Sequence, residues 1–72
     1  MALNNGQLLQ KHMTSLRNAA ARGRKPAGCV AQVAKYEALR ESVAHEDAQL
    51  WNRFCTANRL PKDHTAYHLF NV

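Results

Sequence analysis

Two cysteines and four histidines are the side chains in this 72-residue chain that could form a nucleophilic site. A reactive thiol needs an electropositive, partly open environment and an oriented base. Cys29 and Cys55 instead fall on the apolar faces of predicted helices, where a free cysteine behaves as a small hydrophobic residue. We therefore expect two reduced, buried thiols. We predict no catalytic residue, and we expect the chain not to be an enzyme.

His64 and His68 have a spacing that could suit a metal ion. Four residues apart on a helix, two imidazoles would point toward one metal. No third ligand stands nearby, because Asp63 would point elsewhere on such a helix and neither cysteine belongs to a Cys-x-x-Cys pair. We therefore predict no metal site and no cofactor.

A basic tract, Ala21-Arg22-Gly23-Arg24-Lys25-Pro26, resembles the core of an AT-hook. In that motif the arginines lie along a narrow, electronegative minor groove, and glycine lets the backbone approach. This sequence departs from the motif at Lys25, which precedes the proline. The alternative is a solvated basic turn at the end of a helix. The predicted contacts to nucleic acid or to another acidic surface are Lys11, Arg17, Arg22, Arg24 and Lys25.

The net charge of +5 is unevenly distributed. Residues 1–36 contain six basic side chains and no acidic one, whereas residues 37–72 contain four basic and five acidic side chains. This asymmetry predicts an acidic partner for the first half. Residues 1–28 also resemble a mitochondrial targeting segment, because they are amphipathic and free of acids. An ordinary helix with a positive outer face is the alternative. We expect an intracellular location, with mitochondrion and cytoplasm both open.

The apolar spacing predicts an all-α fold in one small domain, residues 1–72. Leu9, Met13, Leu16 and Ala20 recur at intervals of three and four, which is typical of an amphipathic helix over about 5–22. Gly23 suits the position after its end, and Pro26 makes the following segment a turn.

Residues 29–57 follow one heptad seam that only Arg40 and Asp47 interrupt. One continuous helix in a coiled coil is one interpretation. We favour two helices, about 28–44 and 46–59, because acidic residues suit a first helical turn and an uncapped helix of that length is unusual in a globular protein. On the seam, Arg40 and Asp47 would either reach solvent or bind a second molecule.

The final segment, residues 62–72, is rich in aromatic and β-branched residues, which predicts an extended C-terminal arm. A lone strand cannot pair with itself, so such an arm would need a neighbour. The sequence contains no apolar run long enough for a membrane span.

The supply of core residues is small, because twelve of the apolar residues are alanine and only nineteen are bulky. Chains of this size usually need a disulfide, a metal or a partner for stability. We therefore predict a non-catalytic accessory or binding subunit of a larger assembly, with self-association as another form of partnership. The alternatives are a small nucleic-acid-binding regulator, although the basic half lacks aromatic residues for stacking except Tyr36, and a small protein-binding inhibitor. The predicted partner interface is Trp51, Phe54, Tyr67, Leu69 and Phe70.

Overall fold

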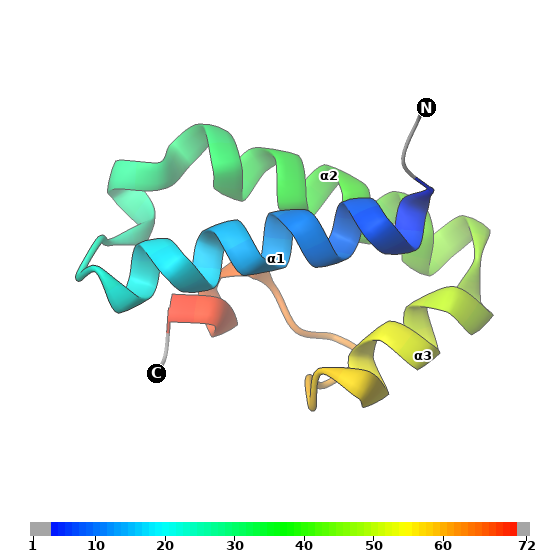
Figure 1. The fold of residues 1–72 in the computed structure, drawn as a ribbon. Coiled ribbons are helices and arrows are strands. Elements are labelled where there is room, and N and C mark those ends of the chain that lie inside the picture. Colours follow the sequence, from blue (N-terminus) through cyan, green and yellow to red (C-terminus); the bar gives the residue numbers. More distant parts are fainter. Residues whose placement is uncertain (1–3, 71–72) are drawn as a thin grey trace.

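The computed structural model describes residues 4–70, which form three α-helices and two short 3-10 helices (Figure 1). In chain order these are α1 (Asn5–Ala21), η1 (Pro26–Cys29), α2 (Val30–Glu46), α3 (Ala48–Ala57) and η2 (Ala66–Phe70). The predicted all-α fold with three helices is confirmed.

Helices α1 and α2 form an antiparallel hairpin, as Figure 1 shows. A capping box starts α1, because the Asn4 side chain accepts a hydrogen bond from the Gln7 amide while the Gln7 side chain accepts one from the Asn4 amide. Gly23 follows the end of α1 with a φ of +84°, a left-handed conformation that glycine adopts without strain. Helix α1 therefore begins and ends at residues whose local chemistry favours a helix terminus.

Asp47 separates α2 from α3. Its backbone is non-helical, with φ −142° and ψ 75°, and its carboxylate accepts a hydrogen bond from the Leu50 amide at 3.2 Å. An aspartate in this position stabilises the start of a new helix by satisfying a free N–H. The prediction of two helices is confirmed, and the single continuous helix is wrong.

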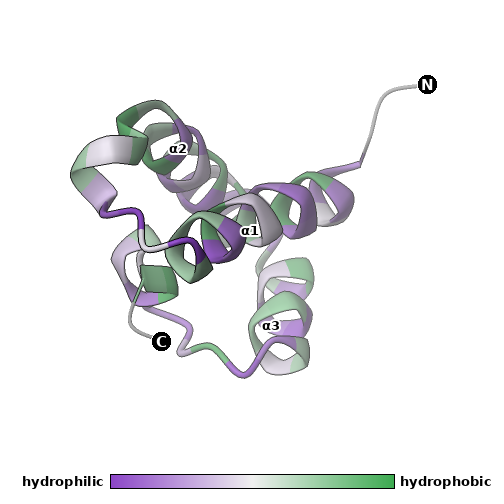
Figure 2. Cartoon of the chain, turned by 60° about the vertical axis from the view of Figure 1, so that its left-hand side comes forward, coloured by the Kyte–Doolittle hydropathy of each residue, from purple (hydrophilic) through white to green (hydrophobic). Residues whose placement is uncertain are grey.

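The core lies between the hairpin, α3 and the C-terminal segment. Helix α3 turns Trp51, Phe54 and Cys55 inward, and α1 contributes Leu9, Met13 and Leu16. At the turn of the hairpin, hydrophobic residues are not all buried. Figure 2 shows a hydrophilic connection there that leads into a hydrophobic start of α2. The bulky side chains are thus mostly used inside the chain, and the hairpin turn is the place where polar and apolar surface meet.

The C-terminal segment is not an extended arm. Residues 66–70 form η2, which packs against α1 and α2 and buries Ala66 and Leu69 (Figure 1). An all-α fold has no sheet edge for this segment to join, so it satisfies its backbone locally, with the His68 amide donating to the Thr65 carbonyl at 3.1 Å. The last two residues of the predicted arm, 71 and 72, lie outside the described residues. Within residues 4–70, no helix combines the length and apolar character needed to cross a membrane.

Candidate functional site

The hairpin turn presents three cations, Arg22, Arg24 and Lys25, which with Gly23 we call the cationic turn. Arg22 ends α1, where its amide donates to carbonyls of the preceding turn. Lys25 has an extended backbone because Pro26 follows it and opens η1. All three basic side chains are exposed. The one ion pair within residues 4–70 lies elsewhere in the fold, so the cationic turn is free to meet an acidic ligand.

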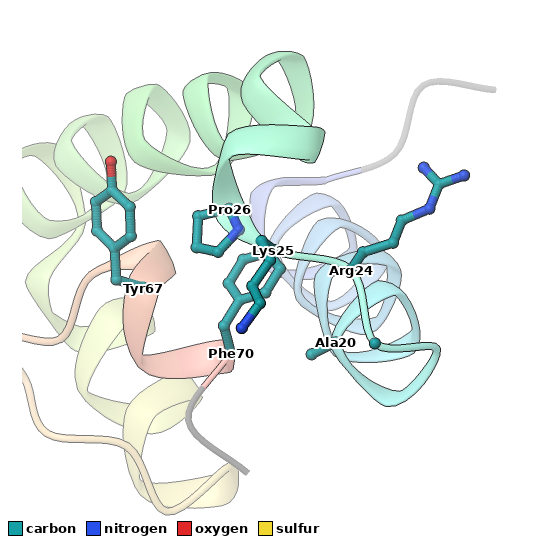
Figure 3. A pocket seen from close by; sticks show the side chains of 7 residues that line it. Ala20, Arg24, Lys25, Pro26, Tyr67 and Phe70 are labelled. Atoms are coloured by element: carbon teal, nitrogen blue, oxygen red, sulfur yellow. The ribbon is translucent and has the colours of Figure 1, made fainter.

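A hollow of about 400 Å³ lies beside the cationic turn (Figure 3). We call it the mixed hollow, since cations and aromatic rings share its wall. In Figure 3, Tyr67 and Phe70 come from η2, and Arg24 extends away from their rings. The residues that line it are Ala20, Gly23, Arg24, Lys25, Pro26, Tyr67 and Phe70. The fold therefore brings the C-terminal aromatic residues against the basic half of the chain.

A second hollow of about 460 Å³, the apolar hollow, adjoins the first. It is lined by Pro26, Ala27, Val30, Val33, Ala34 and Tyr67, and so shares Pro26 and Tyr67 with the mixed hollow. Val30 is 68% exposed and Tyr67 is 56% exposed, and they are the large hydrophobic residues left exposed in the described part of the chain. We call the two hollows together the docking face.

Three of the five residues predicted for a partner interface lie in the chain's own core. Trp51, Phe54 and Leu69 are each less than a tenth exposed, so a partner cannot reach them in this fold. Phe70 is half-buried and lines the mixed hollow, and Tyr67 is exposed. A short chain with few bulky residues uses most of them internally, so hydrophobicity alone does not separate its core positions from its surface positions.

The five predicted basic contacts divide into two groups. Lys11 and Arg17 are exposed on α1, where the Arg17 guanidinium donates to the Asn58 carbonyl at 3.4 Å. The other three form the cationic turn, and two of them, Arg22 and Arg24, also line a polar hollow of about 220 Å³ with Ser15, Asn18, Ala19 and Gln32. The structure therefore places Arg24 and Lys25 around the same hollow as the predicted interface residues Tyr67 and Phe70.

His64 lies at the centre of a buried aromatic cluster. Its ring stacks on Trp51 with centroids 4.9 Å apart, its Nε2 lies 2.6 Å from the Tyr36 hydroxyl oxygen, and its Nδ1 lies 2.7 Å from the Pro61 carbonyl oxygen. Because a carbonyl can only accept, Nδ1 carries the proton and Nε2 accepts from Tyr36. The lowered pKa of His64 favours this neutral form of the ring. Burial lowers the pKa of His64, and burial raises the pKa of Tyr36 above its usual range.

This cluster does not suit activation of a thiol. Cys55 Sγ lies 3.9 Å from His64 Nδ1, which is the nitrogen that already holds a proton. Burial also raises the pKa of Cys55, which disfavours the thiolate. Both Cys55 and Cys29 are free and buried, as predicted.

The histidine pair does not converge on a metal position. His64 precedes η2 and is buried, whereas His68 is exposed and its Nδ1 accepts from the Thr65 amide at 3.1 Å. Residues 4–70 contain no group of three or more metal-ligating side chains. One feature of the sequence does point to the structural role of His64: Tyr36 lies on an apolar face, and a buried tyrosine hydroxyl needs a hydrogen-bond partner.

The docking face combines exposed apolar side chains with cations that take part in no ion pair within residues 4–70. The buried histidine cluster, by contrast, is closed to solvent and joins elements of the fold. Comparison with models of known protein families, with curated protein sequences and with solved structures finds no match to this chain.

Proposed function

We propose that this protein is a non-catalytic accessory subunit that attaches to a larger protein assembly through the docking face. The observation that supports the proposal is the position of Val30 and Tyr67, which are exposed together beside the cationic turn. Monomeric proteins usually leave only small apolar patches exposed, and a hollow patch with a polar rim is typical of a binding site.

The energetics of such a face suit docking. Full burial of an aliphatic or aromatic side chain contributes about 1.5–3 kcal/mol, and Val30 and Tyr67 still have most of that gain available. Cations at the rim contribute more to the rate of association and to specificity than to affinity. The docking face would therefore select a partner by charge and hold it by apolar contact. A small protein that binds and blocks an enzyme would use the same surface.

A mitochondrial location stays part of the proposal, supported by the acid-free amphipathic helix α1. Leu9, Met13 and Leu16 of α1 are almost completely buried in the core. Removal of this helix would therefore unfold the domain, so the proposal requires that α1 is retained after import. Fluorescence microscopy of the chain with a C-terminal fluorescent fusion would test the location.

Nucleic-acid binding is a second candidate, favoured by one observation in the fold. The basic half has no aromatic residue for stacking except Tyr36, but Tyr67 and Phe70 line the mixed hollow together with Arg24 and Lys25. A ring for base stacking beside cations for phosphates is the usual arrangement for binding single strands.

Site-specific photo-crosslinking in the native host tests the proposal. A photoreactive phenylalanine analogue replaces Val30 or Tyr67 on the docking face, and Asn52 or Thr56, exposed on α3, as controls. We expect both docking-face positions to yield the same protein adduct and the α3 positions to yield none. The adduct at Tyr67 should also disappear when Val30→Asp is added. Equal adducts from α3, or no protein adduct from the docking face, would contradict the proposal, and nucleic-acid adducts would favour the second candidate.

A further inference from the structure

We infer that the occupant of the docking face is an acidic, amphipathic segment of another protein, with one apolar side chain in each hollow and carboxylates against Arg24 and Lys25. This inference rests on the proposed function and specifies the chemistry of the partner. It follows from the paired shape of the two hollows and from the charge beside them.

The two hollows form a pair of neighbouring sites with a common wall. Pro26 and Tyr67 line both, so the Tyr67 side chain stands between the apolar hollow and the mixed hollow. Two apolar side chains on one face of a short segment, one on each side of Tyr67, fit this shape. Peptides that dock in grooves commonly use such regularly spaced apolar anchors.

The charges beside the hollows require an acidic partner. Arg24 and Lys25 line the mixed hollow, and the sequence contains no acid before Glu37. Glu37 itself is engaged, because it pairs with Arg40 at 2.8 Å and accepts the Ala66 amide. Within residues 4–70, the one ion pair is therefore Glu37–Arg40, and it does not involve the cations of this face. Carboxylates on the docked segment would form charge-assisted hydrogen bonds with them.

Other occupants fit the face less well. A second copy of this chain has the same net charge of +5, and it would bring another cationic turn with it. A single-stranded nucleic acid would use the mixed hollow but leave the apolar hollow, whose lining is entirely aliphatic apart from Tyr67, without a ligand.

Peptide binding to the purified chain tests the inference. The probe is a fluorescein-labelled helical peptide with two leucines one turn apart, flanked by glutamates. One control peptide has lysines in place of the glutamates, and another has serines in place of the leucines. By fluorescence anisotropy we expect the acidic leucine peptide to bind roughly tenfold or more tightly than either control, which corresponds to about 1.4 kcal/mol.

Variants of the chain locate the binding. Val30→Asp should abolish binding, and the double variant Arg24→Glu, Lys25→Glu should reverse the preference toward the lysine peptide. Arg53→Glu, an exposed charge change on α3, is the matched control and should leave binding unchanged. Because these positions are exposed, circular dichroism and urea unfolding should show that every variant is folded.

Three results would overturn the inference. The first is equal binding of the acidic and lysine peptides. The second is tighter binding of oligothymidylate or phosphatidylserine vesicles that Arg24→Glu abolishes and Val30→Asp does not. The third is a dimer in sedimentation that Val30→Asp dissociates. If the peptides fail while protein adducts still form at Val30 and Tyr67, the partner chemistry is wrong and the proposed function stands; if both fail, both are wrong.

Discussion

The Tyr36 hydroxyl donates a hydrogen bond to Nε2 of His64 over 2.6 Å, and both residues are completely buried. The bond joins the middle of α2 to the segment that follows α3. His64 also donates to the Pro61 carbonyl and stacks on Trp51, whose indole N–H donates to the Lys62 carbonyl at 2.9 Å. These contacts attach the C-terminal segment, and with it Tyr67 and Phe70 of the docking face, to the helical hairpin.

Removal of the Tyr36 hydroxyl should destabilise the fold. In Tyr36→Phe, His64 Nε2 is left buried without a donor, and an unsatisfied buried acceptor costs about 1–3 kcal/mol. Urea unfolding followed by circular dichroism would measure the loss as a lower midpoint with an unchanged slope. The control is Tyr67→Phe, because that hydroxyl is on an exposed residue, and its midpoint should not change. Equal midpoints for Tyr36→Phe and the parent chain would contradict the assigned hydrogen bond.

The stability of the domain should fall in mild acid. Burial holds the pKa of His64 below its unfolded value of about 6.5, an effect that the Pro61 hydrogen bond partly opposes. As the pH falls below about 6.5, the unfolded chain binds a proton that the folded chain does not, so the free energy of unfolding decreases until the pH reaches the folded pKa. Above about pH 6.5, His64 is neutral in both the folded and the unfolded chain, so it does not make the free energy of unfolding depend on pH. Urea unfolding at about pH 7.5 and about pH 5.5 checks this.

The histidine responsible is identified by substitution. His64→Gln keeps one donor and one acceptor but does not titrate, so this variant should be less stable at neutral pH and lose most of the difference between the two pH values. His45→Gln, on an exposed histidine of α2, should keep the full difference. The interpretation is wrong if the His64→Gln variant retains the parent's pH dependence.

Glu37 should hold η2 in place. Its carboxylate accepts the Ala66 amide and pairs with Arg40, so it links α2 to the C-terminal segment. Glu37→Ala removes a hydrogen bond to a charged group, worth about 1.5–3 kcal/mol before screening, and we expect a loss near the lower end because the side chain is 28% exposed. Hydrogen exchange at the Ala66 amide should accelerate. Glu41→Ala, an exposed carboxylate on the same helix, should leave that exchange rate unchanged.

Asp47 should determine that α2 and α3 are separate helices. Asp47→Ala removes the acceptor for the Leu50 amide and should cost about 0.5–2 kcal/mol, whereas Asp47→Asn should retain most of the stability, since asparagine caps about as well. Thermal unfolding measures both values. A rise in helicity with dimer formation in Asp47→Ala would show that the variant had shifted to the continuous helix. Equal losses in both variants would show that the cap contributes little.

The helical elements and most of their boundaries follow from local features of the sequence. The period of Leu9, Met13 and Leu16 fixes the buried face of α1, and Gly23 and Pro26 end it, because these effects depend only on neighbours along the chain. A break close to this point is also predicted from the sequence, since acidic residues suit the first turn of a helix. In the fold Asp47 lies just before α3 and caps it. The cationic turn also follows from the sequence, because its basic residues are neighbours along the chain.

Which apolar residues face solvent depends instead on how the helices pack together. Trp51 and Leu69 looked like interface residues and are core, whereas Val30, at the edge of the α2 stripe, is exposed. The role of His64 and the meeting of Tyr67 with Lys25 depend on contacts between residues far apart in the chain. Local periodicity contains no information about such contacts, because they form only when the C-terminal segment folds back onto the hairpin and competes for a limited area of buried surface.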